Sequence, residues 1–468
     1  MRKFLIYTGS ILLILGASGC KKYLNVNSDP NDPLTVPESL ILSPAEAYVS
    51  NNIAGGISSY IINEWMQNAA VNQPVPNYDS YQVTNTDFNT PWNDFYSTTM
   101  INLVKLNALA NGDANPTYAG IAKVLLAYTL GNATDLWGDI PYSKAFQGNN
   151  NLIPTYDAQD TIYQDLQGLL DSAIINLQAN TGIQPGADDY FYAGSTTEWT
   201  KAAYLLKARF DMHLINAPGY TAATQAGLAL TALQNAMTSN SDDMFFPYTG
   251  SAALNPIFQN YGVGSLSTLI LSSNLVDSLV NRDDPRLAQL VAPAPLTGLD
   301  SGRQDGQSGD IGTLQDYSNP GPFYGNSGSN MYILNYTEAV FLKAEATLII
   351  SGPAAATPIY QAGITAHMTK LGLDPTSAAC QAYLARRGTL TSANAYEYLM
   401  TEKTLSNYFS LENYVDFRRT GYPQLTLAPN AAVPTIPTRF QYPLTEITSN
   451  PQPQQTAKIT DKLWWQGN

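Results

Sequence analysis

The feature of the sequence that most constrains its fold is a succession of segments with helical hydrophobic periodicity. In residues 158–178, Ile162, Leu166, Leu169 and Leu177 recur every three to four positions, opposite Asp and Gln. This spacing gives a helix one apolar face, which must be covered by a neighbour. Similar patterns predict helices at 117–136, 197–215, 223–238, 270–281, 335–350, 357–371, 378–386 and 392–410, and two more that begin at Ser43-Pro44 and Thr90-Pro91.

Successive amphipathic helices with short links pack in pairs, as they do in helical-repeat proteins. The chain has no regular period of about 34 residues, so any repeats are degenerate in sequence. Its 468 residues are long for one domain, and 44% are hydrophobic, which is enough for a substantial core. We therefore predict a mostly α-helical fold built from paired helices, interrupted by long irregular loops.

The N-terminus has the pattern of a targeting signal. Arg2 and Lys3 precede a mainly apolar run at 4–15, and small residues then lead to Cys20. The run is far shorter than the roughly 20 apolar residues that a membrane-spanning helix needs. Small residues directly before a Cys resemble the bacterial lipoprotein signal, in which the Cys becomes the acylated first residue. We therefore expect residues 1–19 to be removed and Cys20 to carry lipid.

The mature chain divides into a tether and one large domain. Residues 20–43 are rich in Asn, Asp and Pro and have little to bury, so we expect a flexible tether. Residues 44–468 hold all the helical patterns and form the predicted domain. The one other cysteine, Cys380, has no partner if Cys20 is lipidated, and we expect it to be a small buried side chain.

Three long loops carry the candidate ligand-binding residues. The segments 68–90, 245–268 and 292–332 combine aromatic residues with Asn, Gly, Ser, Asp and Pro, and loops of this length are usually functional or disordered. A flat Tyr ring matches the C–H face of a sugar, and amide or carboxylate groups match its hydroxyls. The predicted ligand contacts are Tyr78, Tyr81, Tyr261, Tyr317, Tyr324 and Asn326.

Composition argues against several other classes of protein. The net charge is −14 and no basic stripe is present, so we expect no nucleic-acid partner. Only 13% of residues are charged, whereas there are 30 tyrosines, which suits neutral polar ligands. No phosphate loop, nucleophile elbow or His-rich zinc motif occurs. The two histidines, His213 and His367, fall inside apolar helical patterns, so we expect both to pack in the core.

Two alternative kinds of site depend on carboxylates. Glu338 and Glu345 lie seven residues apart on one predicted helix, and a glycosidase needs only two such groups. A packed helix explains both residues better. Asp300, Asp305 and Asp310 lie in a flexible segment that could bind calcium, but the spacing of a known calcium loop is missing. We therefore expect no cofactor and no catalytic activity.

Several short sequence motifs, in order along the chain, are similar to those of the SusD/RagB family of Bacteroidetes lipoproteins, the starch-utilisation-system D-like proteins. The first is Thr134-Asp135-Leu136-Trp137-Gly138-Asp139-Ile140-Pro141-Tyr142. The others are Pro154-x-Tyr156-Asp157, Trp199-x-Lys201-Ala202, Asp284-Pro285-Arg286, Leu334-Asn335-Tyr336-Thr337-Glu338, Asp416-Phe417-Arg418-Arg419-Thr420-Gly421-Tyr422-Pro423 and Pro437-x-Arg439-Phe440-x-Tyr442-Pro443.

The resemblance implies a single domain with tetratricopeptide-like helix pairs and an irregular half that holds the ligand site. It also implies display on the outer membrane beside a SusC-like TonB-dependent transporter, to which the lipoprotein passes a captured oligosaccharide. We expect the residues of the matching motifs to have structural roles, so they do not identify the residues that contact the ligand. Three alternatives stay open: capture of peptides or other nutrients, a glycoside hydrolase with an acidic pair, and a lid without ligand affinity of its own.

Overall fold

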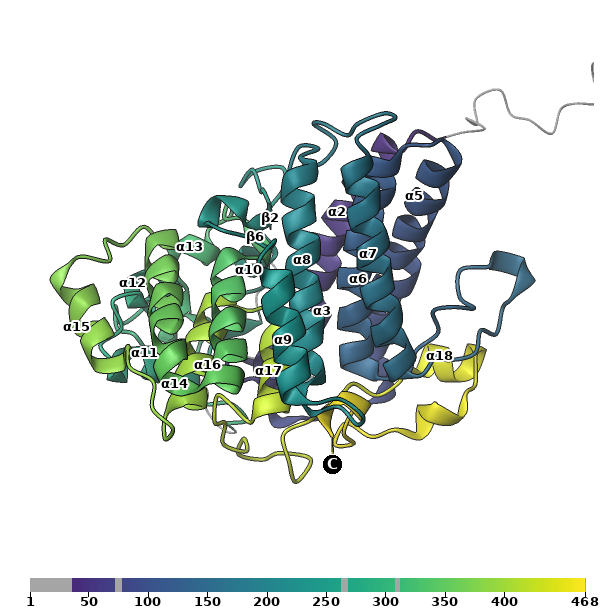
Figure 1. Cartoon of the computed structure of the whole chain (residues 1–468). Coiled ribbons are helices and arrows are strands. Elements are labelled where there is room, and N and C mark those ends of the chain that lie inside the picture. Colours follow the sequence, from purple (N-terminus) through teal and green to yellow (C-terminus); the bar gives the residue numbers. More distant parts are fainter. Residues whose placement is uncertain (1–35, 72–77, 262–267, 308–311, 468) are drawn as a thin grey trace, which may run out of the picture.

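Helices form most of the computed structural model (Figure 1), so the mostly α-helical prediction is confirmed. The structure describes residues 36–71, 78–261, 268–307 and 312–467, so the predicted signal 1–19 and Cys20 lie outside it. The first half of the chain forms α2 (Ser39–Tyr48), α3 (Ile57–Trp65), α4 (Asn89–Asn93), α5 (Ile101–Gly112), α6 (Pro116–Trp137), α7 (Gln159–Ala179), α8 (Thr196–His213) and α9 (Ala222–Leu233).

The second half of the chain has shorter helices around one long helical segment. That segment, α14, is bent at Gly352, where φ is 79°, into two arms that correspond to the predicted helices 335–350 and 357–371. A Cβ at Gly363 would lie 2.7 Å from the Phe341 ring, so the two arms pack closely against each other. The elements are α10 (Pro256–Asn260), α11 (Ser273–Asn281), α12 (Leu287–Leu290), α13 (Pro322–Gly325), α14 (Tyr336–Lys370), α15 (Ala378–Arg387), α16 (Ala395–Ser406), α17 (Glu412–Thr420) and α18 (Leu444–Ser449).

The helix α14 is also long and apolar enough to cross a membrane, a test that core helices of soluble proteins pass as well. In this structure it packs against α9 and α16, and 16 of its residues are buried, including Phe341 and Ile364. These contacts account for its apolar composition through packing inside the domain.

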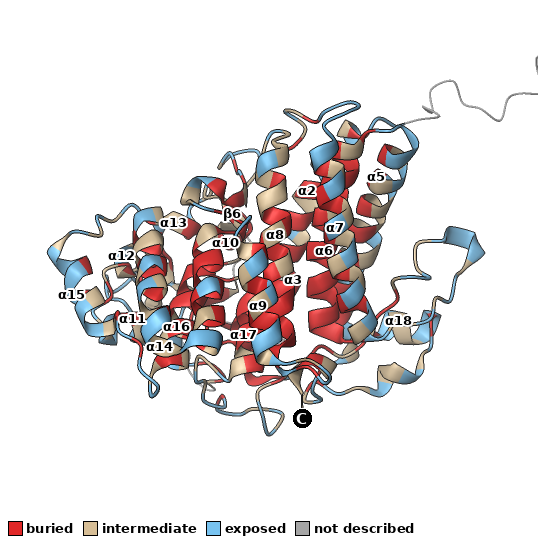
Figure 2. Cartoon of the chain, in the orientation of Figure 1, coloured by how far each residue is buried: buried red, intermediate tan, exposed pale blue. Residues whose placement is uncertain are grey.

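The helices α5 to α9 pack each against the next, with α6 in the middle (Figure 1). The sequence of α6 is almost free of charge, and 20 of its residues are buried. A Cβ at Gly131 would lie 2.5 Å from the Phe210 ring, so the absence of a side chain there lets α6 and α8 approach. Buried residues accordingly fill the zone where these helices meet (Figure 2).

The domain begins earlier than predicted. We predicted a tether to residue 43 and a helix that starts at Ser43-Pro44, but α2 starts at Ser39 and contains Pro44. Pro44 cannot donate a backbone hydrogen bond inside the helix. Packing outweighs this cost, because Leu42 and Ala45 are completely buried and Asn115 Nδ2 donates to Glu38 Oε1 over 2.6 Å.

Short antiparallel ribbons form in and beside the long segments predicted as loops, and one strand occupies the start of the helix predicted at 270–281. These pairings join residues far apart in the sequence, which is why no local pattern revealed them. They fasten the irregular half of the molecule beside the helices. The pairs are β1 (Ala69–Val71) with β3 (Leu269–Leu271), β2 (Met244–Phe246) with β6 (Met331–Leu334), and β4 (Val291–Ala292) with β5 (Asn319–Pro320).

A chain of buried ion pairs connects the two halves. Arg209 on α8 donates to both oxygens of Glu338 on α14, over 2.7 and 2.6 Å. Its Nε also lies 3.5 Å from Glu412 on α17, which in turn pairs with Lys403 on α16. Burial alone would raise the pKa of Glu412, but His213, Arg209 and Lys403 hold that pKa below its ordinary value. The carboxylate therefore stays ionised within the core.

The same series of buried ion pairs explains the roles of several residues that the sequence analysis singled out. Lys403 pairs with Asp416 over 2.8 Å, and Arg419 joins Asp416 to Glu345, with a 2.6 Å contact to each. Glu338 and Glu345 are both buried and bound to guanidinium groups, so the suggested acidic pair offers no accessible carboxylate. Both histidines are at most 1% exposed, which confirms that they pack in the core. Cys380 is buried, also as predicted.

We expect Arg209→Met to lower the free energy of unfolding by about 3–5 kcal/mol, because the buried carboxyl of Glu338 would lose its partner. The matched control is Lys207→Met on the same helix. Its partner Asp171 has a side chain that is 61% exposed, so the loss should stay below about 1 kcal/mol. Urea unfolding curves of both variants measure this difference. Equal losses of unfolding free energy would show that the buried ion pairs stabilise the fold no more than the exposed pair does.

Candidate functional site

A cavity of about 500 Å³ lies where η3 (Val49–Ala54), α3 and α10 meet. Its polar and aromatic lining residues come from two distant parts of the chain, residues 51–60 and 248–260. None of the described residues that line it is charged. The lining consists of Asn51, Gly55, Tyr60, Tyr248, Ala252, Ala253, Leu254, Pro256, Gln259 and Asn260.

The wall formed by η3 depends on an unusual backbone. The segment η3 is a π-helix, and it packs against a second π-helical segment, η6 (Asp94–Met100). Wide turns of this kind interrupt α-helices and recur at functional sites. Asn52 Nδ2 donates to Asp94 Oδ1 over 3.1 Å and so ties the two segments together. Burial raises the pKa of Asp94 to about 6.

Tyr248 orients the amide of Asn51 at the mouth of the cavity. Its hydroxyl donates to Asn51 Oδ1 over 2.7 Å and lies 2.7 Å from Ser50 Oγ. Since a phenol carries one proton, the Ser50 hydroxyl must be the donor in the second bond. Asn51 is exposed, whereas Ser50 and Tyr248 are buried. The buried pair thus holds an exposed amide in one orientation.

Tyr60 and α10 form the opposite wall. Asn255 caps α10 by accepting from the backbone N–H of Ile257 over 2.7 Å, and Asn260 Nδ2 donates to Pro256 O over 2.6 Å. Burial raises the pKa of Tyr60, and the side chain of Asn260 opposes that rise through a hydrogen bond. A Cβ at Gly55 would lie 2.6 Å from Pro256 Cβ, so only glycine lets η3 come this close to α10.

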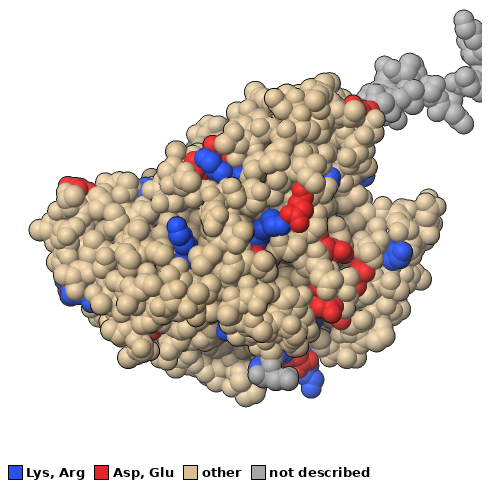
Figure 3. Space-filling view, viewed as in Figure 1, with Lys and Arg blue, Asp and Glu red and all other residues tan. Residues whose placement is uncertain are grey.

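This arrangement suits a neutral ligand with many hydroxyl groups. Two tyrosines supply amphipathic surface, and the amides of Asn51, Gln259 and Asn260 supply donors and acceptors. Binding pockets commonly combine apolar surface with a few fixed polar groups in this way. Charged side chains are sparse on the face of the molecule seen in Figure 3. The lining of the cavity, which includes no charged residue among those described, therefore does not select for an ionic ligand.

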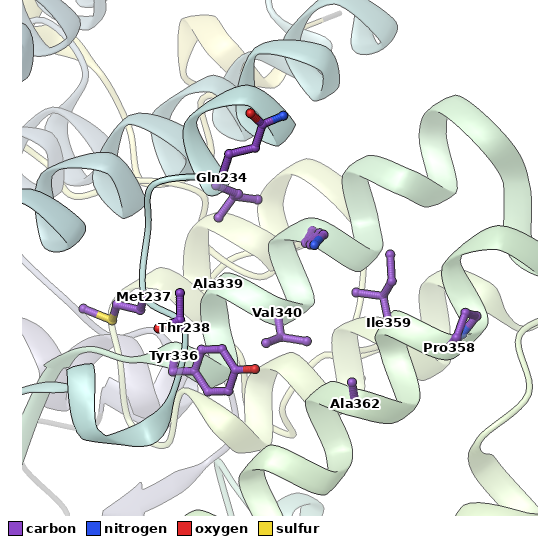
Figure 4. Close-up of a pocket in the computed structure, with 11 residues that line it drawn as sticks. Gln234, Met237, Thr238, Tyr336, Ala339, Val340, Pro358, Ile359 and Ala362 are labelled. Carbon is purple, nitrogen blue, oxygen red and sulfur yellow. The ribbon is translucent and has the colours of Figure 1, made fainter.

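A second cavity, of about 490 Å³, lies between the end of α9 and the two arms of α14 (Figure 4). Met237, Val340 and Ile359 give it a more apolar lining, and Tyr336 is its one aromatic residue among those described. It lacks the set of amides found in the first cavity. We therefore take the Tyr60–Tyr248 cavity as the candidate ligand site.

Four of the predicted contacts are buried in packed positions. Tyr78 and Tyr81 are 9% and 1% exposed. Tyr261 stacks on Phe409 with ring centroids 4.9 Å apart, and Tyr324 stacks on Tyr408 at 4.7 Å. In this conformation a ligand would have to displace those partners, so we leave these four tyrosines out of the candidate site.

The other two predicted contacts remain accessible. Tyr317 is half-buried, and Asn326 is exposed and donates to Pro322 O over 2.9 Å. Neither lines the Tyr60–Tyr248 cavity, so their contact with a ligand stays a prediction. The residues that do line it were missed. Tyr60 falls inside an apolar helical pattern, and no sequence signal marks the π-helix that presents Asn51.

The structure describes two of the three proposed calcium ligands. Asp300 is exposed, Asp305 is buried beside Ser272, and Asp310 lies outside the described residues. Within the part of the chain that the structure describes, no group of three His, Cys, Asp or Glu side chains could hold a metal ion. The calcium alternative therefore stays untested.

Comparison with known structures places the fold. A chitin-binding protein is 25% identical, with a TM-score of 0.78, and the match covers 92% of this chain and 100% of that one. A SusD/RagB family protein from Bacteroides thetaiotaomicron is 23% identical, with a TM-score of 0.79 and coverage of 92% and 99%. A chitin-binding SusD homologue from Flavobacterium johnsoniae is 21% identical, with a TM-score of 0.77 and coverage of 91% and 99%. No curated protein sequence matches significantly.

A family model covers most of the chain. The SusD-like model, described as starch-binding and associating with the outer membrane, matches residues 30–443. This range includes the helices α2 to α17, the three ribbons and all the residues of the Tyr60–Tyr248 cavity. The similarity inferred from short phrases is thus confirmed over nearly the whole domain: the chain belongs to the SusD-like family, a family of binding proteins associated with the outer membrane.

Proposed function

We propose that this protein captures a neutral oligosaccharide in the Tyr60–Tyr248 cavity. The observation that carries the proposal is the lining, which pairs two tyrosines with several amides and no described charged side chain. Aromatic faces and amides are the groups that match the two kinds of sugar surface. Membership of a starch-binding family supports a glycan as the ligand. Two structural neighbours are described as chitin-binding, which makes oligosaccharides built from N-acetylglucosamine a natural second choice.

The protein would act at the cell surface as a lipoprotein. Cys20 after a short apolar signal supports lipid attachment, and the family's association with the outer membrane supports the location. We propose that the domain faces the exterior and passes its ligand to a SusC-like TonB-dependent transporter. No catalytic step is needed, and the buried ion pairs of Glu338 and Glu345 support a binding role.

We expect Tyr60→Ala to weaken binding of the preferred oligosaccharide at least about tenfold, the scale of losing one buried aromatic contact. The matched control is Tyr190→Ala, because Tyr190 is 46% exposed and lies outside the cavity. Tyr317→Ala tests the sequence prediction in the same series. Calorimetric titration of the mature protein with starch and chitin oligosaccharides and with short peptides measures these affinities.

The titration separates the alternatives. Loss with Tyr60→Ala alone supports the cavity, whereas loss with Tyr317→Ala alone moves the site to the loop that contains it. Binding of peptides but of no saccharide would support the peptide alternative. Shortened oligosaccharides in the titration mixture would reveal a hydrolase, and co-purification with a barrel without binding of any ligand would support the passive lid.

Lipid attachment gives a separate prediction. We expect Cys20→Ala to leave the protein unacylated, so that it no longer fractionates with outer membranes and no longer co-purifies with the transporter. Three acyl chains, as in the lipoproteins that the signal resembles, hold a protein far more firmly than one chain, whose binding constant is only about 10⁴ M⁻¹. Cys380→Ala is the control, since that residue is buried. Unchanged fractionation of Cys20→Ala would contradict the lipoprotein proposal.

A further inference from the structure

A third cavity, of about 470 Å³, lies between α11 and the extended segment 426–429. It shares no lining residue with the Tyr60–Tyr248 cavity. The two cavities are nevertheless close neighbours along the chain. Tyr60 lies within α3, and Gln67 follows the end of the same helix. The third cavity is therefore separate from the Tyr60–Tyr248 cavity, although both involve α3 or the residues that follow it.

The chemistry of this cavity differs from that of the first. Its rim consists of exposed polar side chains, among them Asn274, Asp277 and Gln304. Leu427, which is 41% exposed, offers an apolar contact on the opposite wall. Asp277 and Asp305 contribute two carboxylates, and none of the described lining residues is basic. The cavity therefore favours a cation over a neutral or anionic group.

Asp305 is the group that indicates a missing partner. It is only 5% exposed, and its Oδ2 is bonded to the Ser272 hydroxyl. Its Oδ1 is buried and has no hydrogen-bond partner among the described residues. Arg303 does not supply one in this structure: its Nη1 and Nη2 groups donate to Asp79 and to Gln307 O, and its Nε is buried without a partner among the described residues. Native proteins rarely leave a buried carboxylate oxygen unsatisfied without a reason.

The neighbouring charges make a cationic partner favourable. Glu64 on α3 and Asp79 both lie near Asp305, and the charge of Arg303 opposes theirs. Burial raises the pKa of the Asp305 carboxyl well above its ordinary value; the Ser272 hydrogen bond opposes that rise and the charge of Asp79 adds to it. An ammonium group near Oδ1 would favour the ionised carboxylate and reverse this effect.

We propose that this cavity is a second saccharide-binding site, selective for a sugar residue with a free amino group that pairs with Asp305. The sugar hydroxyls would bond to the amide rim, and its C–H face would contact Leu427. A smaller cavity of about 190 Å³ shares Asn274 and Ser278 with it, so the polar groove continues along α11. This inference rests on the proposed function, because it assumes that the protein binds saccharides.

The test is titration of the full mature protein with three probes of equal length: glucosamine oligomers, their N-acetylated forms and glucose oligomers. We expect Asp305→Asn to weaken binding of the glucosamine oligomers by about tenfold to a hundredfold, the range for a charge-assisted hydrogen bond. Asp305→Asn keeps an acceptor for Ser272. Asp277→Asn, at the exposed rim, provides a second variant with little risk to folding and should weaken the same probe.

A matched control variant and a pH series test whether binding depends on the Asp305 carboxylate. Asp283→Asn changes a carboxylate just beyond the end of α11, with a side chain that is 85% exposed, and should leave binding unchanged. Within the pH range in which the amine of the ligand stays protonated, affinity for the glucosamine oligomers should rise with pH, because the pairing requires Asp305 ionised. Affinity for the neutral probes should stay constant over that range.

The outcomes distinguish this inference from the proposed function. Binding of glucosamine oligomers that depends on Asp305 and Asp277 but not on Tyr60 supports the second site. If glucosamine oligomers do not bind, or bind equally well to both Asp variants, the inference is overturned. If the neutral probes still bind and lose affinity with Tyr60→Ala, the proposed function stands without it.

Discussion

The buried chain of ion pairs that begins at Arg209 is the constraint on which the two halves of the molecule depend. Arg209, Glu338, Glu412 and Lys403 come from four different helices and are each at most 3% exposed. Charges placed this deep are tolerated only when every partner is in position. Hydrophobic contacts tolerate small shifts of one helix against another, whereas the buried ion pairs require one relative position of the helices. We infer that it fixes α14, α16 and α17 relative to the bundle of α6 to α8.

A fixed scaffold matters because the candidate site is assembled from segments with little regular structure. The cavity wall formed by η3 is held by Asn52 and Asp94, by close approach at Gly55 and by the Tyr248 hydroxyl. Each is a single short-range contact, and none would hold its position on a mobile base. The ribbons β1–β3 and β2–β6 carry the adjoining segments back to the helices. The helical scaffold thus fixes the positions of the cavity walls, while the irregular segments supply the side chains that line the cavity.

The scaffold could be predicted from sequence because helical periodicity is a local signal. Residues 158–178 and 197–215 were located to within about two residues of α7 and α8. The start of α2 was misplaced because tertiary contacts of Leu42 and Glu38 outweigh the preference of Pro44 for a first turn. The short helix α17 was missed because its buried residues include Glu412 and Asp416, which a hydrophobic pattern does not count.

The site was harder to predict for a physical reason. The sequence predicts that aromatic residues in the loops contact the ligand, yet Tyr81, Tyr261 and Tyr324 are buried and anchor those loops in the core. A long irregular segment without regular hydrogen bonding needs large side chains to hold it, and the tyrosine ring supplies a large apolar area for this purpose. The same residue type therefore occurs both in the anchors of the loops and in the lining of the candidate site. Which role a tyrosine has is decided by its depth, and depth depends on pairings such as that of β1 with β3, which no local pattern in the sequence reveals.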